Sequence, residues 1–142
     1  MIADTARVSE RIREMLSNID GNVIIEGHFA VDVVPPEYID VVFVLRRDPE
    51  ELKRVLMSRS YKESKVMENV AAEILDVCLY DAVSRCGASK VCEVNVTSRD
   101  TNDVVQEILD VFNGVRERRI GIVDWLGKLE SEGKLDEYLK EL

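Results

Sequence analysis

The sequence predicts an α/β protein in which a parallel sheet is flanked by helices. Short apolar runs at residues 23–25, 40–45 and 91–96 alternate with longer segments whose apolar residues recur at helical spacing. Apolar runs without polar alternation are typical of parallel strands buried on both faces. Strands that alternate with helices are typical of an α/β sheet with helices on both sides.

The first third of the chain predicts a helix, a strand, a loop and a second strand. Apolar residues at helical spacing indicate an amphipathic helix over residues 5–19, which Asp20-Gly21-Asn22 then breaks. Residues 23–25 predict the first strand. The connection to the second strand contains Pro35-Pro36, which cannot lie inside a helix.

The central region predicts two further helices. Asp48 is suited to cap a helix that begins with Pro49 and carries acidic residues in its first turn. Residues 58–62 interrupt the helical pattern. A long helix is expected over residues 64–85, ended by Gly87.

The last third predicts a strand, a capped helix and a charged tail. Residues 91–96 alternate apolar residues with Glu93 and Asn95, and the following helix is expected to start at Asp100 and end at Gly114. A basic cluster at residues 116–119 precedes a short segment, 120–125, that is expected to be extended. The tail over residues 126–142 is expected to be helical.

Composition narrows the class of protein. The chain has 142 residues, 46% of them hydrophobic, and a formal charge of −9, which excludes disorder and a membrane span and fits one domain. A net anion argues against unaided nucleic-acid binding but suits a small anionic ligand or a basic partner. The acidic surface also has a simpler explanation, which is solubility.

Compartment and metal chemistry follow from a few residues. The three cysteines form no C-x-x-C motif or Cys/His cluster, so we expect free thiols in a reducing cytoplasm and no zinc site. The N-terminus has no signal-peptide core. The predicted localisation is cytoplasmic.

Charged residues follow each predicted strand. In open α/β sheets, ligands bind at the carboxyl ends of the strands. There the sequence places Glu26 and His28, then Arg46 with its neighbour Arg47, and finally Arg99. This set suits a polyanion with a hydrated metal ion, since arginines hold phosphate oxygens and a carboxylate holds magnesium or its waters. Taken alone, Glu26 is more commonly a solvated loop residue, His28 a structural histidine, and Arg46 and Arg47 could be surface charges; only their joint placement favours a phosphate site.

Three colinear stretches resemble one family of nucleotide kinases. They are Glu-Gly-His at residues 26–28, the strand that runs into Arg46-Arg47, and the pattern R-x-Y-x-x-x-K-x-x-E-N-x-x-A-E-I at residues 59–74. Together with Gly-Ile-Val-Asp-Trp at residues 121–125, they resemble the isoenzyme-6-type adenylate kinases of archaea and eukaryotic nuclei. Members of that family also act in maturation of the small ribosomal subunit.

The resemblance implies roles for individual residues. Glu26 and His28 match the catalytic Asp-x-His of the family, so Glu26 is expected to hold Mg²⁺, partly through water, although Glu is one methylene longer than Asp. Arg59 matches an ATP-binding arginine of the lid, which spans about residues 58–68. Arg99 matches an ATP-binding position usually held by lysine. Arg46 is a candidate phosphate contact.

The implied substrates are ATP, ADP and AMP, with Mg²⁺ bound to ATP. Phosphoryl transfer by this family needs the P-loop, G-x-x-x-x-G-K-[ST], whose backbone amides hold the phosphates. The 142 residues contain no such sequence. We therefore expect one incomplete P-loop-kinase-like domain over residues 1–142 that lacks the first strand and the P-loop. Such a chain should be inactive or impaired, and marginally stable or oligomeric.

Three functions are consistent with these observations. The first is an adenylate kinase-like nucleotide-binding protein. The second is an assembly factor or ATPase that binds a basic protein of the small ribosomal subunit, with the −9 charge and the basic cluster at residues 116–119 as contact features. The third is a remnant with only a structural role.

Overall fold

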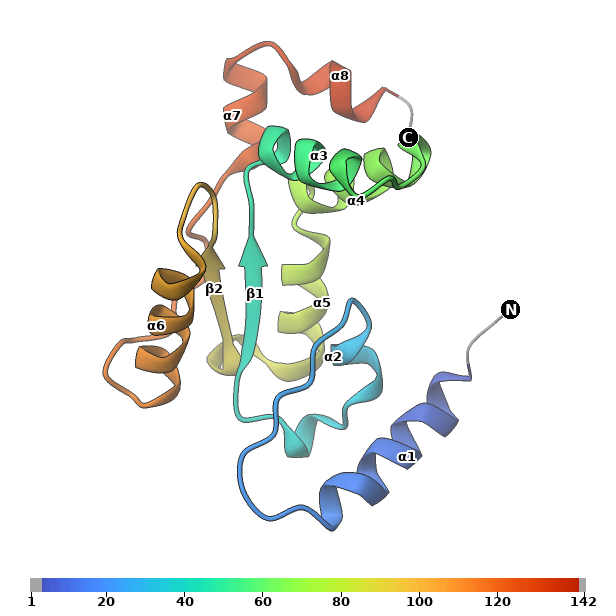
Figure 1. Cartoon of the computed structure of the whole chain (residues 1–142), viewed down its shortest axis with the longest axis vertical. Coiled ribbons are helices and arrows are strands. Elements are labelled where there is room, and N and C mark those ends of the chain that lie inside the picture. Colours follow the sequence, from blue (N-terminus) through green and yellow to red (C-terminus); the bar gives the residue numbers. More distant parts are fainter. Residues whose placement is uncertain (1–3, 141–142) are drawn as a thin grey trace.

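A parallel sheet with helices on both sides confirms the predicted α/β class. The computed structural model describes residues 4–140. Strand β1 (Val42–Arg46) pairs in parallel with β2 (Val91–Asn95), and the register places Val42 opposite Val91. Parallel pairing needs a long crossover, and residues 47–90 supply it through three helices (Figure 1).

The other elements are all helical. In chain order they are α1 (Thr5–Ser17), α2 (Ala30–Val33), the 3-10 turn η1 (Pro36–Tyr38), α3 (Pro49–Ser58), α4 (Glu63–Ile74), α5 (Val77–Cys86), the 3-10 turn η2 (Ala88–Lys90), α6 (Thr101–Phe112), α7 (Trp125–Ser131) and α8 (Leu135–Leu139). The helices predicted to start near Thr5, Pro49 and Thr101 are confirmed. Within residues 4–140, none of the helices combines the length and the apolar character needed to cross a bilayer.

Two small cores hold these elements together. In the first, Val44 and Val91 of the sheet pack against Ala82 of α5, while α6 lies on the opposite side of the sheet (Figure 1). The second core joins α4 to the C-terminal tail. Its buried members are Val66, Val70, Ile74, Trp125, Leu129 and Tyr138. The predicted tail helix is therefore two short helices, α7 and α8, that complete a core.

The strand predicted at residues 23–25 is wrong. These residues have no regular structure, and the side chain of Ile24 is 95% exposed. An apolar run becomes a strand only where another strand can satisfy its backbone groups. In the described part of the chain the sheet has two strands, and neither pairs with this segment.

The single long helix predicted over residues 64–85 is also wrong. The structure has α4 and α5, separated at Leu75 and Asp76, and Asp76 adopts a left-handed conformation with φ of 57°. Aspartate tolerates this conformation better than most residues. The turn lets α5 run along the sheet while α4 crosses above it (Figure 1). Gly87 ends α5 with φ of 82°, as predicted.

The segment predicted to be extended before the tail follows the outer edge of β2. The backbone N–H of Glu93 donates to the carbonyl of Arg119 at 2.7 Å, but no strand is assigned to residues 120–124. Trp125 already belongs to α7. This segment therefore carries the chain from the end of α6 back to the carboxyl edge of the sheet.

Candidate functional site

The carboxyl edge of the sheet is built from two connections that bond to each other. The loop after β1 offers the N–H of Asp48 to the hydroxyl of Thr97, in the loop after β2, at 2.8 Å. In return, the N–H and hydroxyl of Ser98 donate to the Glu51 carboxylate at 2.9 and 3.0 Å. These bonds fix the start of α3 beside the β2–α6 loop.

Asp48 begins α3 as the sequence predicts. Its carboxylate accepts from the N–H groups of Glu50 and Glu51 at 3.0 and 3.2 Å, and also pairs with Lys128 of α7. Burial alone would raise the pKa of Asp48, but Lys128 and the two backbone donors outweigh it, so the pKa lies below its usual range. The same pair raises the pKa of Lys128.

A shallow groove lies between α3 and the loop that follows β2. It has a volume of about 390 Å³ and is open to solvent. Its lining residues are Glu51, Arg54, Val55, Ser58 and Ser98. Ser58 precedes Arg59 and Ser98 precedes Arg99, so both predicted ATP-binding arginines are next to residues that line this groove.

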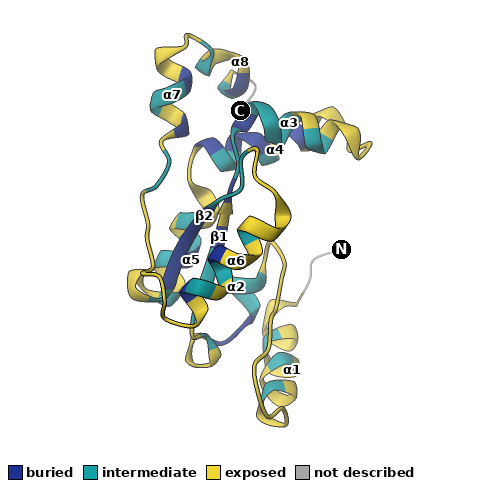
Figure 2. Ribbon diagram, turned by 60° about the vertical axis from the view of Figure 1, so that its left-hand side comes forward, coloured by how far each residue is buried: buried dark blue, intermediate teal, exposed yellow. Residues whose placement is uncertain are grey.

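Arg59 lies at the turn of the predicted lid. The lid region consists of the end of α3, an exposed turn over residues 59–62 and the first half of α4 (Figure 2). Arg59 directly follows α3, and its side chain is exposed with no hydrogen bond or ion pair to any described residue. Ser60 turns the chain with φ of 59°.

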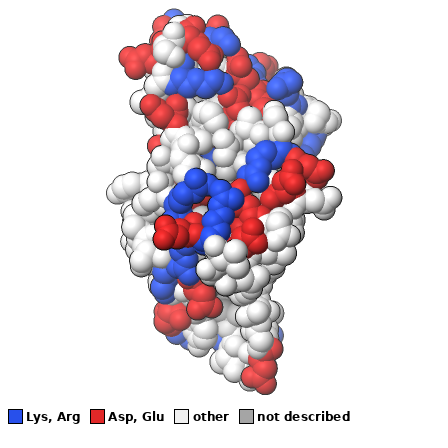
Figure 3. Space-filling view, turned by 90° about the vertical axis from the view of Figure 1, so that its left-hand side faces the viewer, with Lys and Arg blue, Asp and Glu red and all other residues white. Residues whose placement is uncertain are grey.

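Arg99 is held by the protein itself. Its guanidinium donates to the carbonyl of Asn95 at 2.9 Å and to the carboxylate of Glu107 at 2.5 Å. Glu107 is only 6% exposed, and Arg116 and Arg119 approach it at 3.5 and 3.7 Å. Three arginines thus surround one carboxylate, and basic side chains gather on the face that carries α6 (Figure 3).

Arg46 is the centre of a buried ion network. It is 1% exposed, and its guanidinium bonds to Glu73 at 2.8 Å, to Asp76 at 2.5 Å and to Glu93. Burial opposes its charge, but the carboxylates of Glu73, Asp76 and Glu93 outweigh that effect and raise the pKa of Arg46 further. A phosphate could bond to this guanidinium only by displacing one of these carboxylates. The sequence had suggested instead that the Arg46 guanidinium is free to contact a phosphate.

Sequence reasoning missed the carboxylates around Arg46. Burial raises the pKa of Glu73, although Arg46, the Trp125 indole at 2.8 Å and the Arg47 N–H donate to it. Glu93 accepts from Gly121 and Ile122. The signal was weak, since an acidic residue in an alternating strand usually faces solvent. Here it lies opposite Val44 on the neighbouring strand, two register positions from Arg46.

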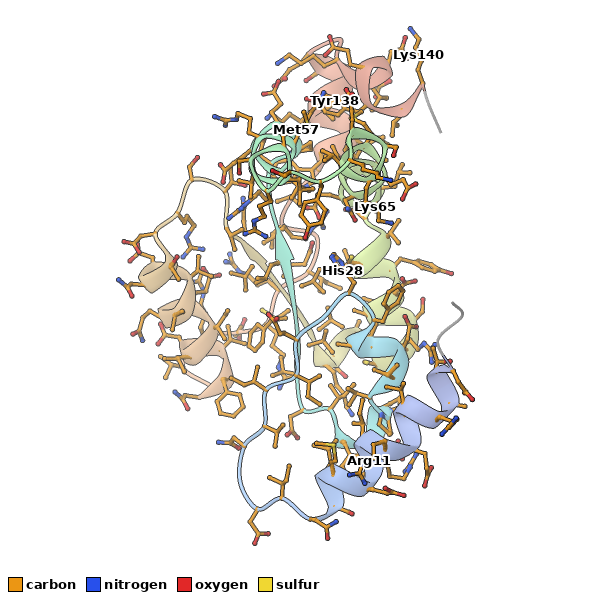
Figure 4. The ribbon with its side chains drawn as sticks, turned by 45° about the vertical axis from the view of Figure 1, so that its right-hand side comes forward. Arg11, His28, Met57, Lys65, Tyr138 and Lys140 are labelled. Atoms are coloured by element: carbon orange, nitrogen blue, oxygen red, sulfur yellow. The ribbon has the colours of Figure 1, made fainter. Side chains whose placement is uncertain are left out.

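Glu26 and His28 lie in the loop that connects α1 to α2. Both side chains are exposed, and neither makes a hydrogen bond or ion pair within residues 4–140. His28 lies at the tip of this loop, below the helices that carry Met57 and Lys65 (Figure 4). The structure thus leaves both side chains free to meet a ligand but does not bring them into contact with Arg59 or Arg99.

The described residues contain no ready-made metal cage. Residues 4–140 hold no group of three or more His, Cys, Asp or Glu side chains placed to bind an ion. Mg²⁺ is commonly held by only one or two carboxylates together with substrate phosphates and water. The single exposed carboxylate of Glu26 fits that mode of binding.

Comparison with known proteins places this sequence in a family. Residues 2–76 match the family model described as an AAA domain. A "Putative adenylate kinase" of Methanocaldococcus jannaschii is 38% identical over 119 residues, which cover 84% of this chain and 62% of that protein. Proteins of the same name from Thermococcus onnurineus and Archaeoglobus fulgidus are 35% and 33% identical, over 96% and 92% of this chain and 69% and 71% of theirs.

These matches cover a larger share of this chain than of its relatives. The match to the Methanocaldococcus protein covers 84% of this chain. It covers less than two thirds of the length of that protein. The Thermococcus protein is nevertheless covered over more than two thirds of its length at 35% identity, and the AAA-domain match takes in more than half of this chain. The chain therefore belongs to the AAA-domain family of archaeal adenylate kinase-like proteins.

Proposed function

We propose that the protein binds ATP in the groove between α3 and the β2–α6 loop. The observation that carries the proposal is that Ser58 and Ser98, the sequence neighbours of Arg59 and Arg99, line this groove, which is open to solvent and lies at the carboxyl edge of a parallel sheet. The relatives' shared name, "Putative adenylate kinase", supports a nucleotide as the ligand.

The two arginines would act differently. The side chain of Arg59 makes no hydrogen bond or ion pair with the described residues and lies on an exposed turn, so it is available for charge-assisted bonds to the ATP phosphates as the lid closes. Arg99 is oriented by Asn95 and Glu107, which suits a fixed donor beside the nucleoside. The bonds between Ser98 and Glu51 keep the two sides of the groove at a constant separation.

Glu26 and His28 would act on the phosphate side. Mg²⁺ brought in with ATP would neutralise phosphate charge, and Glu26 would hold its waters through an exposed carboxylate. His28 follows two residues later in an exposed loop, from which it can donate to or accept from the same water shell. Substrates of the intact family, ATP and AMP, are therefore the proposed ligands.

Turnover is a separate matter from binding. The 142 residues include no G-x-x-x-x-G-K-[ST] motif, so no backbone cradle of that kind surrounds the transferred phosphoryl group. We propose that this chain binds MgATP but transfers phosphate to AMP slowly or not at all. A coupled assay of ADP formation should show no rate above background, and rapid AMP phosphorylation would contradict this.

Binding is tested by calorimetry with MgATP. Arg59→Ala removes the free guanidinium of the lid, and we expect the Kd to rise about tenfold, which corresponds to about 1.4 kcal/mol. Arg11→Ala is the control, because Arg11 is an exposed residue of α1 paired with Glu14. Unchanged affinity in Arg59→Ala, or no binding by the unaltered chain, would contradict the proposal.

A second candidate function rests on the formal charge of −9. An acidic surface suits a basic protein of the small ribosomal subunit, which the protein would bind as an assembly factor or ATPase. Such binding should weaken steeply as salt is raised. Pull-down with purified basic small-subunit proteins at low and high salt tests it, and binding to none of them would exclude it.

A further inference from the structure

One basic side chain lines the groove between α3 and the β2–α6 loop directly. Of the five residues that line it, Arg54 of α3 is the one that carries a positive charge. Arg59 and Arg99 are each one position away from a lining residue. Sequence reasoning assigned Arg54 no role, because it lies outside the motif at residues 59–74.

The guanidinium of Arg54 is free. Arg54 is exposed, and its side chain makes no hydrogen bond or ion pair with any residue in the described part of the chain. Glu51 lies three residues earlier on the same helix, a spacing at which opposite charges commonly pair. The two side chains nevertheless form no ion pair, so all the donors of Arg54 are available to a ligand.

The one carboxylate of the groove is already bonded to the protein. One oxygen of Glu51 accepts from the N–H and the hydroxyl of Ser98 at 2.9 and 3.0 Å. The other oxygen lies 3.4 Å from Nε of Arg47, and the Glu51 side chain is only 18% exposed. The charge that the groove presents to solvent is therefore mainly the positive charge of Arg54.

The remaining lining residues favour a hydrophilic ligand. The groove has a volume of about 390 Å³, which lies within the usual range of small-molecule sites. Val55 is its one apolar lining residue. Sites that enclose a flat apolar group are lined mostly by apolar and aromatic side chains, so this groove suits an anionic chain better than a nucleobase.

We propose that Arg54 binds the phosphate chain of the nucleotide, so that this groove is the polyphosphate end of the site and the base lies beyond it. The inference rests on the proposed function, since it assigns one end of the proposed ATP site. A guanidinium can donate two parallel charge-assisted bonds to phosphate oxygens. Because the attraction grows with ligand charge, triphosphate should bind more tightly than diphosphate, and diphosphate more tightly than monophosphate.

The test is calorimetry of the 142-residue chain with two ligands, MgATP and inorganic tripolyphosphate. Arg54→Gln should raise the Kd of both at least about tenfold, because it removes the free cation. Arg54→Lys keeps the charge without the planar fork and should give an intermediate Kd.

Lys53→Gln is the matched control. It makes the same change of charge one residue away on α3, but the Lys53 ammonium lies 5.5 Å from the centre of the Tyr138 ring and does not line the groove. Its Kd values should stay within about twofold of those of the unaltered chain, because exposed charges act weakly at a distance in salt. Circular dichroism of each variant checks that it is folded.

The two ligands separate this inference from the proposed function. Tripolyphosphate binding that Arg54→Gln weakens, without any binding of MgATP, would support the phosphate subsite and contradict the ATP site. MgATP binding that Arg54→Gln and Lys53→Gln change equally would overturn the inference and leave the ATP site standing. Binding of neither ligand by the unaltered chain would overturn both.

Discussion

Arg46 shows how one residue determines the arrangement around it. Its guanidinium draws carboxylates from α4, from the turn before α5 and from β2 onto the end of β1. The Glu73 carboxylate also accepts from the Trp125 indole, so the same network reaches the C-terminal tail. Residue chemistry could predict that an arginine after a strand meets anions. It could not predict that those anions belong to the protein, because Glu73 and Glu93 are 27 and 47 positions away.

The first prediction concerns the stability that Arg46 provides. Arg46→Ala leaves Glu73 and Glu93 without their cation in a buried site, and we expect a loss of about 3–5 kcal/mol in the free energy of unfolding. Urea denaturation followed by circular dichroism measures it. Arg85→Ala is the control, because it removes an ion pair of 2.8 Å with Asp32 at the surface, worth at most about 1 kcal/mol. Equal losses in both variants would contradict the role of the network.

At the scale of elements, the predictions that rest on local sequence signals are confirmed, and those that depend on tertiary contacts are not. The caps at Asp48 and Asp100 are visible in the sequence because a capping side chain bonds to its own neighbours. The strand predicted at residues 23–25 is wrong because strand pairing depends on a partner strand, which the sequence of this segment does not specify. The break between α4 and α5 was not predicted because it depends on Asp76. This residue adopts a left-handed conformation and forms an ion pair with Arg46, which is distant in the sequence.

The second prediction concerns the contact between α3 and α7. Because the pKa of folded Asp48 is lowered, its contribution to stability is fully present above the unfolded pKa and is lost as the pH falls through the folded pKa. Asp48→Asn keeps a capping side chain but removes the charge that pairs with Lys128.

We therefore expect Asp48→Asn to be about 1 kcal/mol less stable than the unaltered chain at pH 7, and to approach it below about pH 4. Thermal unfolding across this pH range measures the difference. Asp100→Asn is a matched control, since Asp100 caps α6 without an ion pair among the described residues. A constant gap between Asp48→Asn and the unaltered chain at all pH values would contradict the role of the charge.

The whole molecule combines a predictable fold class with a sheet that has two strands in residues 4–140. The alternation of apolar segments predicted the α/β class, whereas the lid at residues 58–68 and its Arg59 stay predictions from the motif at residues 59–74. The groove itself could not be predicted, because it depends on bonds that join α3 to the loop after β2. The pairing of β1 with β2 alone, among the described strands, likewise emerges only when the elements are assembled.

The most direct test of the account is to map MgATP binding on the chain by amide chemical shifts in solution. We predict that the shifts change at residues 58–62 and 97–99, on the two sides of the groove, and at the Glu26–His28 loop, while α1 is unaffected. ADP should affect the same residues, and AMP alone should affect them less. No shifts at saturating MgATP, or shifts confined to residues away from the groove, would contradict nucleotide binding at this site.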